Sequence, residues 1–96
     1  MGVIELITKY FGTPTSDKDY RGYKIHRYAT DNVEVNAWEN RKGNTTISVA
    51  MRGKVLKKWW LVEPGKFEET LKECIRIVAT EAADILNEVR KLGQHD

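Results

Sequence analysis

The spacing of apolar residues changes near Glu63, and this change limits the fold more than any other feature of the sequence. Between residues 21 and 62, apolar and polar residues alternate, which is typical of strands with one buried face. From Pro64 to Leu92, apolar residues recur at spacings of three and four, as on one face of a helix. The sequence therefore predicts an α+β fold in which a sheet is followed by one long helix.

Four strands are expected in the alternating part. They cover residues 23–28, 33–38, 45–52 and 54–62, with Asn, Asp and Gly in the short segments between them. Connections this short join neighbouring strands, so the strands are predicted to form an antiparallel meander. The aliphatic residues of the first three strands define the side that is expected to face the core. The residues on that side are Tyr23, Ile25, Val33, Val35, Ala37, Ile47, Val49 and Met51.

The fourth strand does not define an inner and an outer side. One side carries Val55, Trp59 and Leu61, and the other carries Leu56, Trp60 and Val62. Either assignment leaves one lysine of the pair Lys57 and Lys58 on the outer side, together with one tryptophan of the pair Trp59 and Trp60.

A helix is expected at each end of the sequence. The first covers residues 2–12 and ends at Gly12, and residues 13–19 are expected to form a loop. The second covers residues 64–92. Its apolar stripe keeps a heptad spacing over three repeats: Leu71, Ile75, Val78, Ala82, Ile85, Val89 and Leu92.

The second helix is longer than the sheet. At 1.5 Å per residue it spans roughly 43 Å, against about 27 Å for a strand of eight residues. Its last turns are therefore expected to extend past the sheet, unless residues 2–12 cover them. A second copy of the chain is the simplest source of another apolar surface, which predicts a homodimer through five residues of the stripe: Val78, Ala82, Ile85, Val89 and Leu92.

The predicted outer side of the sheet is not an ordinary polar surface. Its residues on the first three strands are Lys24, His26, Tyr28, Glu34, Asn36, Trp38, Thr46, Ser48, Ala50 and Arg52. Aromatic rings among cations suit single-stranded nucleic acid, because unstacked bases stack on the rings while Lys and Arg contact phosphates. Glu34, an acid on the same side, counts against this interpretation.

Charge is unevenly distributed along the chain. The net charge is +2, but residues 1–62 carry eleven Lys or Arg against six acids, whereas residues 63–96 carry five against eight. No acid occurs between Arg41 and Lys58. Such a basic surface favours a polyanionic partner, although basic residues are also common on plain solvated surfaces.

These features predict a protein that binds single-stranded nucleic acid, DNA rather than RNA, with little sequence specificity. The residues expected to contact it are Lys24, His26, Tyr28, Trp38, Arg41, Lys42, Arg52, Lys54, Lys57, Lys58, Trp59 and Trp60. Exposed Trp, Tyr and Arg residues are also enriched at protein interfaces. The alternative is therefore a viral or inhibitor-type interaction module that acts through the aromatic side or the helix stripe.

No catalytic or metal-binding constellation is visible in the sequence. His26 stands alone on a strand, His95 lies in the C-terminal tail, and Cys74 is expected to be a buried apolar residue. One Cys and two distant His do not make a zinc site. Neither an enzyme nor a metal or other cofactor is expected. No secretory leader and no apolar run long enough to span a bilayer are visible, which predicts an intracellular protein.

The predicted layout, four antiparallel strands followed by one long helix that pairs subunits, resembles known single-strand binders. It is similar to the archaeal ThermoDBP family and, more distantly, to the Whirly and transcriptional-coactivator group. The resemblance covers residues 21–92 and is one of architecture and residue class, while the helix at residues 2–12 has no counterpart. It implies that the sheet, its aromatic residues and its basic turns hold the strand, through Tyr28, Trp38, Trp59 or Trp60, and the Arg41–Lys42 turn.

Overall fold

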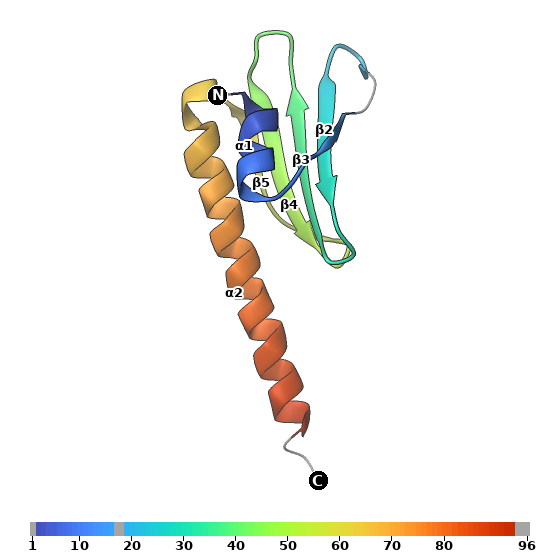
Figure 1. Cartoon of the computed structure of the whole chain (residues 1–96), viewed down its shortest axis with the longest axis vertical. Coiled ribbons are helices and arrows are strands. Elements are labelled where there is room, and N and C mark those ends of the chain that lie inside the picture. Colours follow the sequence, from blue (N-terminus) through green and yellow to red (C-terminus); the bar gives the residue numbers. More distant parts are fainter. Residues whose placement is uncertain (1, 17–18, 94–96) are drawn as a thin grey trace.

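A computed structural model describes residues 2–16 and 19–93 of the chain. It has an α+β fold, with a short helix, a sheet and a long C-terminal helix (Figure 1). The elements are α1 (Val3–Tyr10), β1 (Thr15–Ser16), β2 (Lys24–Ala29), β3 (Val33–Glu39), β4 (Thr45–Met51), β5 (Lys54–Val62), a 3-10 turn η1 (Pro64–Lys66) and α2 (Phe67–Gly93). The α+β class and the order of the elements agree with the sequence prediction.

The sheet is an antiparallel meander with the strand order β1-β2-β3-β4-β5. The four predicted strands are present, and β1 is an addition, because residues 13–19 were expected to form only a loop. β1 pairs with β2 through Thr15 and Ser16, and the Thr15 hydroxyl donates a hydrogen bond to the carbonyl oxygen of Arg27, at 3.1 Å. This short pairing satisfies part of the edge of β2, which would otherwise be open.

The core lies on one side of the sheet, where α1 and the first half of α2 cover it (Figure 1). The fully buried apolar side chains of the sheet are Val35, Ala37, Ile47 and Val49, as predicted for β3 and β4. From the helices they meet Val3, Leu6, Ile7, Phe67, Leu71 and Cys74. We refer to this side as the covered side and to the other as the open side.

The predicted orientation of β2 was wrong. Ile25 pairs with Trp38 and His26 with Ala37, and directly opposite residues share one side of a sheet. His26 is therefore buried, at 4% exposure, and Tyr28 packs against the core, whereas Tyr23, Ile25 and Arg27 belong to the open side. Lys24, two residues before His26 and paired with Glu39, also lies on the covered side.

The orientation of β2 has a physical reason in the residues that close the core at this edge. The ring of Tyr28 packs against Phe11, with 5.7 Å between centroids. The buried imidazole of His26 has Glu39 as a partner, at 3.2 Å between Nε2 and Oε2. An aromatic ring and a paired histidine thus fill positions for which the pattern of the sequence favoured aliphatic residues.

Two bulges in the pairing with β4 explain why β5 has no regular inner and outer side. Thr46 is opposed by two residues, Trp60 and Leu61, where regular pairing gives one. Both side chains are exposed, Trp60 by 71% and Leu61 by 51%. Leu56 is the extra residue of the second bulge, and it packs with Trp59 against the core.

α2 extends past the sheet, as its length predicted. Val78 is the last residue of the described part of α2 that packs against the core, and Leu86, Val89 and Leu92 are exposed beyond it. Figure 1 shows this projecting half, and the chain measures 57 Å along its longest axis against 24 and 21 Å along the others.

α1 does not cover the projecting half of α2, so the alternative that it does so was wrong. It lies beside the first turn of α2. There the Tyr10 hydroxyl donates a hydrogen bond of 2.6 Å to the Glu68 carboxylate, and Lys9 lies 3.6 Å from the same oxygen. Both contacts lower the pKa of Glu68, the hydrogen bond more than the charge.

The bulge at Leu61 gives a first prediction. Leu61 has a φ of 48°, a left-handed conformation that costs a non-glycine residue roughly 1–2 kcal/mol. Leu61→Gly is expected to raise the free energy of unfolding by about 0.5–1 kcal/mol, because glycine adopts this φ without a clash. Urea unfolding followed by tryptophan fluorescence measures the change.

Val55→Gly is the matched control, because Val55 is exposed on the same strand and has no positive φ. It is expected to lower the free energy of unfolding by about 0.5–1 kcal/mol. Destabilisation of both variants to the same extent would contradict the assignment of strain to Leu61.

Candidate nucleic-acid interface

The side chains on the open side differ in size from strand to strand. Those of β4 are small and consist of Thr46, Ser48 and Ala50. Larger side chains flank them, with Trp38 on β3 and Trp60 on β5. The open side therefore has a shallow trough that follows β4. Near Thr46 and Ser48 the trough has a hollow of about 450 Å³, lined by Tyr23, Asn36, Trp38, Thr46, Ser48, Lys58 and Trp60.

Two tryptophans stand on opposite sides of this hollow. Trp38 pairs with Thr46, and Thr46 is in turn opposed by Trp60. The two indoles thus belong to one row across the sheet and stand two strands apart, which is roughly 10 Å. Trp38 is 37% and Trp60 71% exposed, so both rings are available to a ligand.

Two tyrosines support Trp38 at the edge of the sheet. Tyr20 and Tyr23 exchange backbone hydrogen bonds of 2.8 and 2.9 Å across a tight turn, in which Arg21 and Gly22 both have positive φ, as in a type I′ hairpin. Each tyrosine ring lies 6.1 Å from the Trp38 ring, between centroids. Sequence reasoning placed Tyr23 in the core and omitted Tyr20, and Gly22 was the only turn-favouring residue between the two tyrosines.

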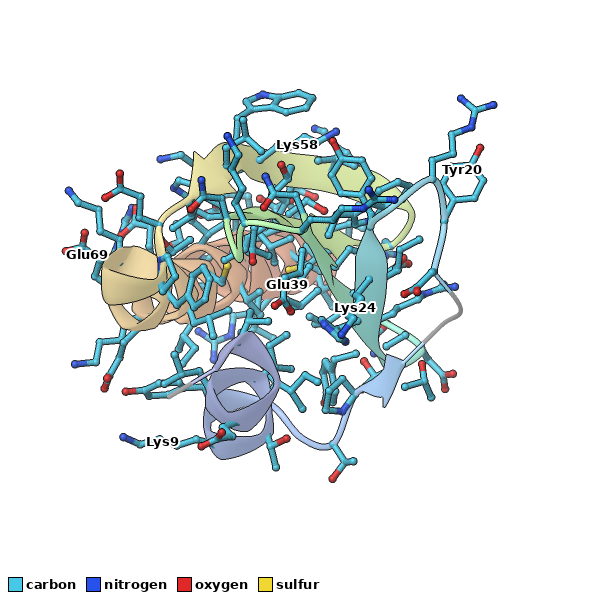
Figure 2. All side chains as sticks on the ribbon, turned by 90° about the horizontal axis from the view of Figure 1, so that it is seen from above. Lys9, Tyr20, Lys24, Glu39, Lys58 and Glu69 are labelled. Atoms are coloured by element: carbon cyan, nitrogen blue, oxygen red, sulfur yellow. The ribbon has the colours of Figure 1, made fainter. Side chains whose placement is uncertain are left out.

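Lys58 is the cation closest to the hollow. It pairs with Ser48, and its ammonium group lies 4.2 Å from the centroid of the Trp60 ring, within the range of a cation–π contact. Figure 2 shows Lys58 on the side of the sheet away from α1. Lys57 points to the covered side, where its ammonium group lies 5.1 Å from the centroid of Trp59.

The acid of the open side, Glu34, is paired. Its carboxylate lies 3.1 Å from Nε of Arg27 and accepts a hydrogen bond of 2.9 Å from the side-chain amide of Asn36. Its charge is therefore largely offset by the neighbouring guanidinium, and the objection raised by its position on this side is weakened.

The acid-free window of the sequence is divided between the two ends of the trough. Arg41 and Lys42 lie in the turn before β4, and Arg52 lies in the turn after it. Lys54 follows this turn but pairs with Met51, on the covered side. Successive hairpin turns lie at opposite ends of a meander, and Figure 1 shows these two turns at opposite ends of the sheet. β4 has seven residues, so the two groups of cations are separated by about 20–25 Å.

The remaining predicted contacts lie away from the trough. Lys24, His26 and Tyr28 belong to the covered side, as described above, and Figure 2 shows Lys24 beside Glu39, on the side of α1. Trp59 packs against the core. The trough therefore unites Trp38, Trp60 and Lys58 with the two basic turns, and adds Tyr23 to the predicted set. Tyr20 lies beside it, against Trp38.

The groups that could carry other chemistry are few. Cys74 is buried, and burial raises the pKa of its thiol to about 12. His26 is paired with Glu39, and His95 lies outside the described residues. Within residues 2–16 and 19–93, no three or more His, Cys, Asp or Glu residues are grouped so that they could hold a metal ion.

Comparison with protein-family models, with curated proteins and with solved structures finds no match. The resemblance to ThermoDBP and related single-strand binders therefore stays a prediction. No helix of the described chain is both long and apolar enough to cross a lipid bilayer.

Burial of Cys74 leads to a second prediction. Its thiol is expected to stay protonated and unreactive toward dithionitrobenzoate at pH 8 in the folded protein, since the thiolate is the reactive form. In concentrated guanidinium chloride it is expected to react stoichiometrically. Ala79→Cys, on the exposed side of α2, is the control and is expected to add one fast-reacting thiol. A native thiol that reacts as fast as this added one would show that Cys74 is accessible.

Proposed function

We propose that this protein binds single-stranded nucleic acid along the trough on the open side of its sheet. The observation that carries the proposal is the pair Trp38 and Trp60, which stand on either side of the small residues of β4, with Lys58 beside them. Stacking on each tryptophan is worth about 1–3 kcal/mol per base. Bases inside a duplex do not expose their faces, so the rings favour a single strand.

Electrostatic attraction supports the same path. A strand that follows β4 passes from the Arg41 and Lys42 turn, over Lys58, to the Arg52 turn, so that cations meet phosphates at both ends and near the middle. Ion pairing between Glu34 and Arg27 removes most of the opposing charge. Phosphate contacts and stacking occur with any sequence, and binding of low specificity follows from them.

The third prediction tests this binding directly. A fluorescent oligo-dT is expected to bind at low salt and to quench tryptophan fluorescence, with affinity that falls steeply as salt rises. Trp60→Ala is expected to weaken binding about 5- to 150-fold, the equivalent of the stacking energy. Trp59→Phe, on the covered side, is the control and is expected to change the affinity little. An oligo-U of equal length compares RNA with DNA.

Each outcome separates one part of the proposal from the others. No binding at low salt would refute it. Binding without quenching would retain the phosphate contacts and remove the stacking. A protein partner is the alternative occupant, since Val55, Trp60 and Leu61 expose apolar surface on β5. Its affinity would depend only weakly on salt.

We also propose that two copies associate through the projecting half of α2. Leu86, Val89 and Leu92 are exposed there, and a groove of about 520 Å³ lies between α2 and the end of the sheet. The apolar side of this groove is formed by Val33, Met51, Val78, Ala82, Ile85 and Val89. Because the heptad spacing continues to Leu92, one copy presents to another the stripe that two paired helices require.

The fourth prediction concerns this association. Ile85→Lys and Val89→Lys are each expected to halve the mass measured by light scattering, because a charge within the stripe opposes burial. Asn87→Lys, on the opposite side of the same turn, is the control and is expected to leave the mass unchanged. A monomeric parent protein would refute the dimer without affecting the nucleic-acid proposal.

A further inference from the structure

The apolar stripe of α2 has two different environments along its length. Leu71 and Val78 pack against the core, whereas Val89 and Leu92 are exposed. At about 100° per residue, the stripe from Val78 to Leu92 stays within roughly 40° of one direction around the helix. The projecting half of α2 therefore presents its apolar residues on the side where the first half carries the sheet (Figure 1).

The end of the sheet limits the groove along this stripe. Val33 and Met51 line it from the sheet, next to Val78 of α2. Nearer the N-terminus of α2, the same side of the helix is covered by the sheet, and Leu71 is fully buried there. A second helix can thus lie along the projecting half, but it cannot continue past Val78 toward the N-terminus of α2.

This steric limit decides between the two directions in which a second copy can pair. In a parallel pair, equivalent residues lie side by side, so the first half of the second α2 would occupy the place of the first copy's sheet. In an antiparallel pair, the first half of the second helix and its sheet lie past Gly93, away from the first sheet. Of the two directions, only the antiparallel one leaves room for both sheets.

The same limit selects the register of the pair. Heptad packing places Leu92 of the second copy opposite Ile75, Ala82 or Val89. Opposite Ile75, the second helix would run past Val78 into the sheet. Opposite Val89, it would leave Ala82 uncovered. Opposite Ala82, it fills the groove, and the small side chain of Ala82 leaves space for the larger leucine.

The residues on either flank of the stripe agree with this register. On one flank, Leu86 lies opposite Leu86 of the second copy, which buries an apolar side chain that is exposed in the single chain. On the other flank, Lys91 of the second copy lies level with Glu81, and this attractive pair occurs twice. Glu88 approaches its own copy on that flank, which gives one repulsive contact against two attractive ones.

We infer that two copies pair their α2 helices antiparallel, with Leu92 of each opposite Ala82 of the other. The inference rests on the proposed association of two copies and adds its geometry. Leu71 of one copy then lies roughly 48 Å from Leu71 of the other along the helices, at 1.5 Å per residue. The two sheets are at opposite ends of the dimer, and each keeps its own trough.

Disulfide trapping tests the direction and gives the fifth prediction. Under mild oxidation with diamide, a mixture of Ala82→Cys and Leu92→Cys is expected to form a mixed disulfide dimer. Either variant alone is expected to form none, because its two added thiols lie about 15 Å apart along the helices, and bridged Cα atoms are usually ~4.4–6.8 Å apart. Mass spectrometry identifies the dimers. Asn87→Cys, on the opposite side of α2, is the control and is expected to form no disulfide dimer, and the native Cys74 is buried.

Leu86→Lys provides a second measurement with opposite signs for the two directions. Antiparallel pairing brings the two new charges together, so association is expected to weaken about tenfold or more, as measured by light scattering over a range of concentrations. Parallel pairing would place each charge beside Glu81 and strengthen association. Ala83→Lys, which points away from the second copy, is the control and is expected to leave association unchanged.

The outcomes distinguish this inference from the association on which it rests. If the parent protein is monomeric, both fail. If Leu92→Cys alone forms a disulfide dimer as readily as the mixture, the association stands and the antiparallel direction is overturned. A dimeric parent protein whose variants form no disulfide dimer in any combination would overturn the contact of Leu92 with Ala82.

Discussion

The burial of one side of the sheet against α1 and the first half of α2 determines the rest of the structure. Ile47 and Val49 from the interior strand β4 and Leu71 and Cys74 from α2 are fully buried in this contact. At about 25 cal/mol per Å² of apolar surface, it is the main source of stability in so small a chain. Because the core uses only this side and only the first half of α2, the other side of the sheet and the end of the helix are left exposed.

Much of the fold could be predicted, because long segments of constant periodicity carry redundant information. In β3 and β4, several aliphatic residues indicate which side faces the core, and this assignment was correct. In β2, only Ile25 favoured one side for the core, while His26 and Tyr28 lay on the other. The pairing with β3 and the contacts of His26 and Tyr28 place these two on the covered side instead. The bulges of β5 depend on pairing with β4, which no pattern within β5 alone encodes.

About half of the candidate site could be anticipated. Trp38, Lys58 and one member of the tryptophan pair were expected on the open side, and they line the hollow there. The acid-free window was expected to act as one basic patch, but a meander places successive turns at opposite ends of the sheet. The hydrogen bonds that orient Asn36 and pair Glu34 were also hidden from the sequence, because they depend on side-chain geometry across two strands.

β5 contains two pairs of identical neighbouring residues, and these affect how the surface responds to an insertion in the chain. Lys57 and Lys58 are adjacent, as are Trp59 and Trp60, while the bulges decide which of each pair faces outward. If an insertion in the β4–β5 hairpin shifted β5 by one residue, every side chain would change sides. The open side would then still present a lysine and a tryptophan two positions apart. Lys57 and Trp59 would thus replace Lys58 and Trp60 on the open side, so this part of the surface would keep its residue types after a one-residue shift in strand register.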